Sequence, residues 1–341
     1  MKILAIESSC DETAAAVLDC DSTRLDVQSN CIYSQIDKHA LFGGVVPEIA
    51  SRMHIECIPY VIDSALLEAA CTLQDVDAIA VTYAPGLIGA LLVGVNYAKT
   101  LAYSLNIPLI PVHHIEGHIF ANFLSKPDLK PPFICLVASG GHSTIVHIKS
   151  FNTFEIAAKT RDDAAGEAFD KIARVLHLGY PGGPAVQNAA KSGNIHAFNF
   201  PKVKLENSYD FSFSGVKTKV INEVHKLEQN GKDIPVADIA ASFQEAVCEV
   251  LAQRVVSIAG NYNINQITLA GGVAANEVLR AKCTKLSKEN NIKLSYPPLT
   301  LCTDNAAMIG ARAYYNYLDG NIAQSDLNAM ATKEITVKNS V

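Results

Sequence analysis

The chain has 341 residues, 49% of them hydrophobic and 18% charged, with a mean hydropathy of +0.16. This composition is typical of a well-packed globular protein and excludes a disordered chain, and the length suits about two domains. The formal net charge of -6 argues against indiscriminate nucleic-acid binding. The longest apolar run, residues 87–95, is far shorter than the roughly 18 residues that span a bilayer, and Glu7 ends the N-terminal apolar run before a signal peptide could form.

In the first half of the chain, a strand hairpin is followed by alternating helices and strands. The hairpin is predicted over residues 2–7 and 13–19, joined by a polar turn. After it, we predict a helix from Pro47 towards Ala70 that Pro59 kinks, a strand over 77–83, a helix over 87–104 and a strand over 107–112. This alternation favours an α/β sheet with antiparallel strands at its edge.

The second half repeats this plan. Its hairpin is predicted over residues 133–138 and 143–148. It is followed by helices near 162–177, 214–229, 236–259 and 273–290, by strands over 265–270 and 292–296, and by a last helix at about 304–318. Two such units facing each other across a cleft would form an actin-like or sugar-kinase-like nucleotide-binding fold. The Pro-rich stretch 126–132 is the best candidate linker.

The nine cysteines are odd in number, widely spaced and without a C-x-x-C pair. A disulfide framework would be denser and even, and a zinc ribbon would need close pairs. We therefore expect reduced thiols in a cytoplasmic protein, with an isolated catalytic cysteine as the alternative.

The segment HHIEGH, residues 113–118, contains a candidate metal site. Residues four apart on a helix lie about 40° apart in azimuth and about 6 Å apart along the axis, so the imidazoles of His114 and His118 could reach one ion. Histidines that bind no metal are the alternative. Asp304, at the start of the last predicted helix, either caps that helix or completes a two-histidine, one-carboxylate site with open coordination positions.

The same segment is close to the metalloprotease pattern H-E-x-x-H, in which the general-base glutamate directly follows the first histidine. Glu116 is instead two residues after His114, about 200° around a helix, and would point away from the ion. The geometry therefore disfavours a metallopeptidase of that type.

Three glycine-rich turns in the second half favour a bound nucleotide. They are Ser139-Gly140-Gly141, Gly182-Gly183 and Gly271-Gly272. Glycine lets backbone N–H groups approach an anion, and a helix N-terminus adds to the attraction. Ordinary turns are the alternative. The P-loop and Rossmann signatures are both absent from the sequence.

Acidic residues occur at two further places. Asp162 and Asp163 suit the N-terminus of the helix predicted near 162–177, whereas Asp170 lies too far along it to cap and is a candidate partner for ribose hydroxyls. Asp11 and Glu12 are either simple turn residues or, in a cleft, acceptors of a proton from an amine nucleophile.

The charge is distributed unevenly along the chain. Residues 1–100 contain 5 Lys/Arg and 13 Asp/Glu, so the remainder carries a small net positive charge. Lysines recur in the second half, at positions 191, 202, 204, 217, 219, 226, 232, 282, 285, 288 and 293. A solvated helix face explains most such lysines, but a polyanion would bind in this half.

Eleven blocks, taken together and in order, resemble the TsaD family of tRNA N6-adenosine threonylcarbamoyltransferases, formerly called glycoproteases. The blocks are ESSCDET (7–13), FGGVVPEIASRMH (42–54), APGLIGALLVG (84–94), HHIEGH (113–118), ASGGHS (138–143), DDAAGEAFDK (162–171), YPGGP (180–184), FSFSGVKT (211–218), SFQEAV (242–247), LAGGVAAN (269–276) and CTDNAAMIG (302–310). The departures from the usual family residues are minor and lie at Phe42, Ala84, Ala138 and Ser143.

The resemblance implies an α/β fold of the actin-like, sugar-kinase-like class, with two duplicated RNase H-like domains made of residues 1–125 plus 304–341 and of residues 131–303. It implies one divalent metal, Fe²⁺ or Zn²⁺, at His114, His118 and Asp304. The positions that match the family's adenylate site are Val137, Ala138, Ser139, Gly140, Gly141, Asp170, Gly183 and Asn276. Gln187 stands where some relatives carry an acidic residue and is not included.

The activity implied by the resemblance is transfer of the threonylcarbamoyl group from threonylcarbamoyl-AMP to N6 of adenosine 37 in tRNAs that read codons beginning with A. Asp11 or Glu12 would accept the N6 proton. The expected partners are the tRNA anticodon loop, a paralogous TsaB-type subunit and a TsaE-type small ATPase, with no membrane. The alternatives are a small-molecule kinase of the same superfamily, a metallopeptidase and a non-catalytic paralogous subunit.

Overall fold

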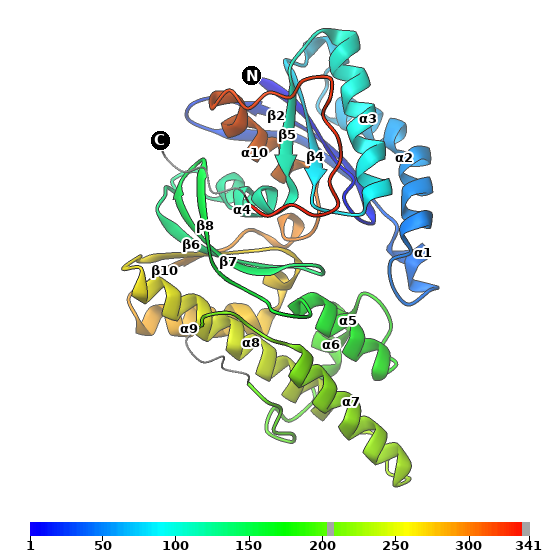
Figure 1. The fold of residues 1–341 in the computed structure, drawn as a ribbon, viewed down its shortest axis with the longest axis vertical. Helices are drawn as coiled ribbons and strands as arrows, with labels where there is room; N and C mark the ends of the chain where they lie inside the picture. The colour runs from blue at the N-terminus through cyan, green and yellow to red at the C-terminus, as the bar shows by residue number, and fades with distance from the viewer. Residues whose placement is uncertain (203–207, 336–341) are drawn as a thin grey trace. The chain divides into compact units, whose positions relative to one another are not determined.

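The computed structural model describes residues 1–202 and 208–335, so Lys204 and the last six residues of the predicted first domain lie outside the described part. The chain divides into two compact units (Figure 1). The first comprises Met1–Pro131, Lys149–Phe154 and Pro297–Val341, and the second comprises Pro132–Ile148 and Glu155–Tyr296. No helix within the described ranges has the length and apolar character needed to cross a membrane.

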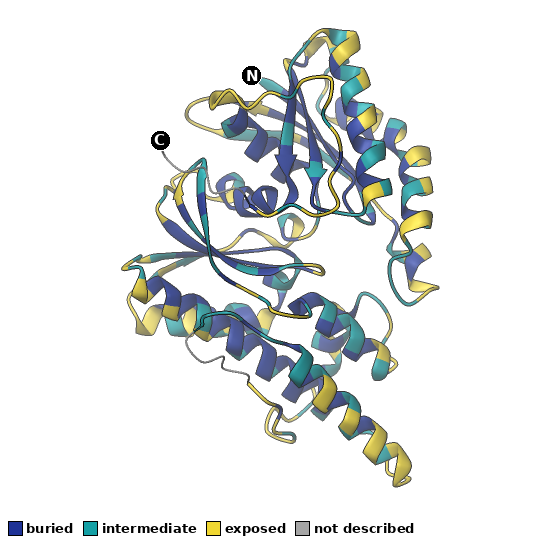
Figure 2. Ribbon diagram, viewed as in Figure 1, coloured by how far each residue is buried: buried dark blue, intermediate teal, exposed yellow. Residues whose placement is uncertain are grey.

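The first unit is built on a five-stranded mixed sheet in the order β3-β2-β1-β4-β5. The strands are β1 (Lys2–Glu7), β2 (Glu12–Cys20), β3 (Leu25–Ser34), β4 (Ala78–Ala84) and β5 (Leu109–His113). β2 is antiparallel to β1 and β3, whereas β1, β4 and β5 are parallel to one another. The parallel strands are buried along almost their whole length, as strands covered on both faces must be (Figure 2).

Helices cover both faces of this sheet. The helices of the unit are α1 (Ile36–Ala40), α2 (Pro47–Glu68), α3 (Ile88–Leu105), α4 (His114–Ser125) and α10 (Ala306–Leu318). Alternate side chains of a strand point to opposite faces; Leu4 and Ile6 therefore join the apolar cluster under α2 and α3. α10 packs against β1 and β2 on the other face, where Gly310 lies directly against Leu18. α2 continues through Pro59.

The second unit contains a sheet in the order β10-β9-β6-β7-β8. Its strands are β6 (Phe133–Ala138), β7 (Ser143–Ser150), β8 (Thr153–Lys159), β9 (Gln266–Ala270) and β10 (Lys293–Ser295). Its helices are α5 (Ala165–Val175), α6 (Gly182–Ala190), α7 (Ser214–Gln229), α8 (Val236–Asn261) and α9 (Glu277–Glu289). The long helix α8 packs on β6 and β9, and α9 packs on β10.

The two sheets share one topology, which confirms the α/β fold and the repeated plan. β6 pairs antiparallel with β7 and parallel with β9, just as β1 pairs antiparallel with β2 and parallel with β4. In each sheet a third strand, β3 or β8, extends the hairpin and a fifth, β5 or β10, extends the parallel side. The sequence patterns do not predict β3, β8, α1 or α6. β3 alternates poorly because much of it is partly exposed, and α6 begins with two glycines and a proline.

The helices α4 and α10 are held together by a buried ion pair. The Arg312 Nε donates to the Glu116 carboxylate at 2.6 Å, and its Nη1 donates to the Phe151 carbonyl and the Asn152 side chain. The guanidinium also lies over the Phe120 ring. Both charged side chains are less than one-tenth exposed. Since α4 is buried on almost every side, its position depends on this contact.

We expect Arg312→Leu to cost about 3–5 kcal/mol of the free energy of unfolding, because it leaves the Glu116 carboxylate buried without its partner. Urea denaturation measures this difference. The matched control is Arg52→Leu, which breaks the exposed Arg52–Glu48 pair on α2 and should cost no more than about 1 kcal/mol. Equal losses in the two variants would contradict the role given to the buried pair.

Candidate metal centre and nucleotide-binding loops

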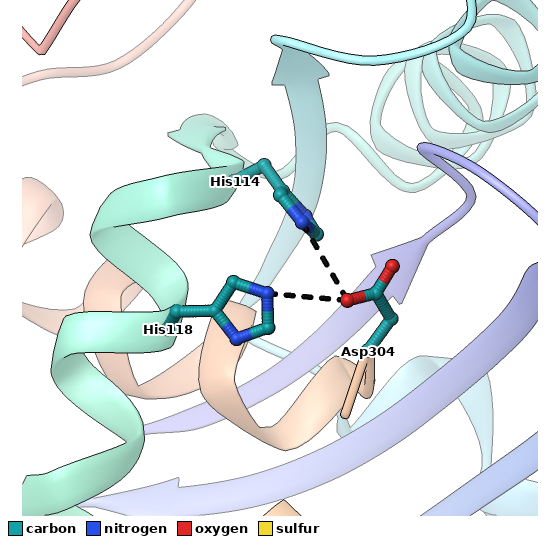
Figure 3. Close-up of side chains that lie close together, drawn as sticks. All are labelled: His114, His118 and Asp304. Atoms are coloured by element: carbon teal, nitrogen blue, oxygen red, sulfur yellow. Dashed lines mark ion pairs between the residues drawn. The ribbon is translucent and has the colours of Figure 1, made fainter. Parts of the chain in front are cut away.

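Two imidazoles and a carboxylate converge in the first unit (Figure 3). His114 is the first residue of α4, directly after β5, and His118 follows one helical turn later. Their Nε2 atoms lie 3.6 and 3.1 Å from the Asp304 Oδ1. One ligand atom from each residue lies within 4.8 Å of the other two. The structure thus brings together the three side chains that the sequence singled out.

Asp304 faces the histidines, and its neighbour Asn305 caps the helix. α10 begins at Ala306, and its N-cap is Asn305, whose side chain accepts from the Met308 N–H at 3.0 Å. The interpretation of Asp304 as a helix cap is therefore wrong. Its carboxylate is about one-fifth exposed and lies opposite the two imidazoles instead.

The chemistry of this donor set fits a divalent ion. His118 is fully buried, and within the described ranges neither of its ring nitrogens has a hydrogen-bond partner. Buried polar atoms are nearly always hydrogen-bonded, so an unsatisfied nitrogen facing a carboxylate needs an explanation. Two imidazoles and one carboxylate suit Fe²⁺ or Zn²⁺ and leave coordination positions open.

Charged neighbours perturb the titration of the groups around His114. Burial opposes the imidazolium, but Asp304 and Glu7 raise the pKa of His114 to about 9. Burial likewise disfavours the Glu7 carboxylate, yet His114 holds the pKa of Glu7 below its usual value. A proton bound to His114 has to leave when a metal binds, because a ligating imidazole is neutral.

Asp11 and Glu12 lie at the turn that enters β2, and both are largely screened from solvent. The Glu12 carboxyl accepts a long hydrogen bond from the Ser34 hydroxyl at 3.4 Å. Burial, Asp304 and Asp11 together raise the pKa of Glu12 to about 10. Both carboxyl groups stay candidate proton acceptors.

Glu116 points away from the two histidines, as the helix geometry predicted. Its carboxylate lies against Arg312 of α10. It therefore has no position from which to act as the general base of a metallopeptidase.

The second unit gathers the remaining candidate residues around the end of β6. Val137 and Ala138 end the strand, and the Ser139–Gly141 turn follows, with its two glycines open to the surroundings. The Gly166 N–H at the start of α5 donates to the Ser139 carbonyl at 3.2 Å. Gly271 has a φ of +86°, and a Cβ there would collide with the Ala138 carbonyl. The turns after β6 and β9 and the α5 N-terminus thus meet closely, as a backbone anion site requires.

Asp170, Gly183 and Asn276 flank this arrangement. Asp170 Oδ1 accepts from the Gly182 N–H at 2.7 Å, which fixes the start of α6, where Gly183 is open. Gly182 and Gly183 are thus helical rather than a turn. Asn276 is the N-cap of α9: its Oδ1 accepts from the Leu279 N–H and its Nδ2 donates to Gln244.

The interpretation of Asp162 and Asp163 as caps of their own helix is wrong. α5 begins at Ala165 without a side-chain cap. Asp162 instead accepts from the backbone N–H groups of Phe213 and Ser214 at the start of α7, at 2.8 and 3.2 Å. Asp163 pairs with Lys171 and Lys217.

The fold is that of the actin-like α/β class. HypF from T. kodakarensis aligns with 96% of the chain at a TM-score of 0.63 and 16% identity, and the chain spans about half (49%) of that protein. A second similar structure is the activator of 2-hydroxyisocaproyl-CoA dehydratase from Clostridium difficile with bound ADPNP. The alignment covers 94% of this chain and 97% of the activator, at a TM-score of 0.53 and 13% sequence identity.

Sequence comparison gives the family. The model of the TsaD family, described as tRNA N6-adenosine threonylcarbamoyltransferase, matches residues 26–311 of this chain. Proteins of that name from Clostridioides difficile and Clostridium novyi are each 56% identical, over 97% of this chain and over 98% and 96% of their own lengths. The chain belongs to the TsaD family.

We expect the chain to bind one Zn²⁺ in a titration, and His118→Ala to lose most of that affinity because one of three ligands is gone. Competition with a chromogenic chelator measures the change. His196→Ala, which removes an exposed histidine of the second unit, should bind as the wild type does. Unchanged affinity in His118→Ala would rule out the centre.

Proposed function

We propose that this protein transfers the threonylcarbamoyl group of threonylcarbamoyl-AMP to N6 of adenosine 37 in tRNAs that read codons beginning with A, releasing AMP. The observation that carries the proposal is 56% identity, over nearly the full length of both chains, to proteins named for this transfer. The grouping of His114, His118 and Asp304 supports it.

The donor has to be activated, because the lone pair of the adenine N6 amine is delocalised into the ring. A divalent ion held by His114, His118 and Asp304 would supply positive charge to the phosphate or carbamoyl oxygens of the donor. The backbone N–H groups of Ser139–Gly141 and of Gly271–Gly272 would stabilise negative charge on the phosphate. Asp170 would accept a hydrogen bond from a ribose hydroxyl.

The proton on N6 has to be removed during transfer. We assign this step to Asp11 or Glu12, the two carboxyl groups at the turn that enters β2. Asn276 would contribute to the adenylate site by fixing the start of α9, since both ends of its side chain are hydrogen-bonded within the unit.

Single-turnover transfer from preformed adenylate to tRNA tests the proposal. Asp304→Ala should lose its metal and lower the rate by about 100-fold or more, the usual effect of removing one stabiliser of transition-state charge. Asp326→Ala, which removes an exposed carboxylate near the C-terminus, should transfer at the wild-type rate. A metal-free Asp304→Ala protein with a near wild-type rate would end the metal-centred scheme.

The alternative activities have less support. The glycine turns suit a small-molecule kinase, but a kinase has no use for two histidines and an aspartate at one point. A metallopeptidase lacks its general base, because Glu116 is paired with Arg312. A non-catalytic subunit would not need the three converging side chains.

We further propose that the protein acts in the cytoplasm with a paralogous subunit and a small ATPase. All nine cysteines are free thiols, which suits a reducing compartment. The exposed groove between α2 and α3, lined by Ile55, Leu92, Val93, Tyr97 and Leu101 among others, offers the paralogous subunit an apolar surface.

The anticodon loop would be bound through lysines of the second unit. Several of these lysines are already paired: Lys202 and Lys282 lie against Glu249, and Lys217 lies against Asp163. Lys285 and Lys288 on α9 are exposed and share one helical face. They are the stronger candidates for phosphate contacts.

We expect Lys285→Ala combined with Lys288→Ala to weaken binding of an anticodon stem-loop and to flatten its salt dependence, by about 0.7–0.9 in the log–log slope for each lost phosphate contact. Fluorescence anisotropy across a salt series measures both effects. Arg24→Ala, an exposed cation in the acidic first hundred residues, should change neither. If the double substitution leaves the slope of the salt dependence unaltered, the RNA does not bind at these two lysines.

A further inference from the structure

Glu7 is a buried carboxylate that the proposed reaction does not use. It is the last residue of β1 and is fully buried. Its Oε1 accepts from the Ser9 N–H at 2.6 Å, and its Oε2 accepts from the Thr82 hydroxyl at 2.6 Å. The same Oε2 lies 3.1 Å from the His114 Nδ1. Burying a carboxylate is costly unless it is hydrogen-bonded, and here each of the two oxygens accepts a hydrogen bond, from the Ser9 N–H and from the Thr82 hydroxyl.

The two ring nitrogens of His114 face different groups. Nδ1 faces Glu7 and the Ser9 hydroxyl, each at 3.1 Å, whereas Nε2 faces Asp304. A neutral imidazole has one N–H and one lone pair, and a carboxylate can only accept. Glu7 therefore selects the form with the proton on Nδ1 and the lone pair on Nε2, on the side of Asp304.

The support behind Glu7 is rigid. The Ser8–Ser9 turn is fixed to the start of α3, where the Leu87 N–H donates to the Ser9 carbonyl and the Ser8 hydroxyl donates to the Ala90 carbonyl. A Cβ on Gly86 would lie 2.6 Å from the Ser9 carbonyl oxygen, so only glycine permits this approach. By contrast, neither nitrogen of His118 has a hydrogen-bond partner among the described residues.

We propose that Glu7 is a positioning residue that holds His114 as an Nε2 ligand of the divalent ion; this rests on the metal centre of the proposed function. Ligating histidines commonly donate their other N–H to a carboxylate, and loss of that partner costs about 10–100-fold in metal affinity. Thr82 and Ser9 in turn orient Glu7. No sequence pattern indicates this role, because Glu7 meets its polar partners only once the chain is folded.

Glu7→Gln tests the assignment sharply. The glutamine oxygen has to accept from the Ser9 N–H, so its amide nitrogen faces His114 and donates to Nδ1. The substitution therefore favours the proton on Nε2, the wrong nitrogen for binding. We expect a 10–100-fold loss of Zn²⁺ affinity, in line with other such partners. We also expect loss of the hydrogen-bonded Nδ1–H signal of His114 in ¹H–¹⁵N spectra of the zinc-loaded protein.

Glu48→Gln is the control, since it makes the same change to an exposed carboxylate of the same unit that pairs with Arg52 and not with His114. It should leave both the Nδ1–H signal and the zinc affinity in place. Glu7→Gln binding zinc within twofold of the wild type would overturn the proposal. If Glu7→Gln does not fold, spectra of the wild-type protein test the proposal instead. Coordination of zinc through the His114 Nδ1, or no zinc binding at all, would overturn it.

The outcome for Glu7 is separable from the outcome for the reaction. Wild-type protein that binds zinc with an Nδ1–H on His114 but transfers no threonylcarbamoyl group would support the Glu7 assignment and refute the proposed activity. If the wild-type protein transfers the group but Glu7→Gln binds zinc with unchanged affinity, the proposed activity is supported and the Glu7 assignment is refuted.

Discussion

The contact between α4 and α10 is the constraint on which the candidate metal centre depends. His114 and His118 lie on one helix, and Asp304 lies just before the other. Their side chains meet because the helices pack closely, with Gly117 against Ile309. The Glu116–Arg312 pair fixes the two helices against sliding or rotation, on a side of α4 away from the histidines. Structural and chemical roles are thus divided between neighbouring residues of one segment.

The internal duplication explains how residues so far apart in the chain come together. α4 follows β5, the last strand of the first sheet, and α10 follows β10, the last strand of the second. The two helices therefore occupy equivalent places in the repeated plan, yet both pack within the first unit. The starts of α4 and α10 thus lie side by side. The first contributes the two histidines and the second contributes Asp304.

Local patterns predict most of the elements and two of the three candidate metal ligands. The bounds predicted for the strand hairpins and α7 agree closely with the structure, because short continuous apolar runs between polar or glycine-rich turns mark the buried strands. Helix geometry alone put His114 and His118 together and turned Glu116 away. It could not join Asp304 to them, because that contact depends on how distant helices pack; the pairing came from family resemblance. For the same reason, no local signal showed that Asp162 caps α7 or that Glu7 faces His114.

The first unit is made of stretches that are separated in the sequence, and this affects the order in which its parts are synthesised on the ribosome. Since domains fold as their residues emerge, the first sheet is synthesised before the second unit, whereas α10, which covers one face of that sheet, is synthesised after the second unit. The intervening second unit can fold completely in the meantime. A nascent chain therefore leaves an apolar face of the first sheet uncovered until the second unit has been synthesised, and only then does Asp304, the third candidate metal ligand, emerge.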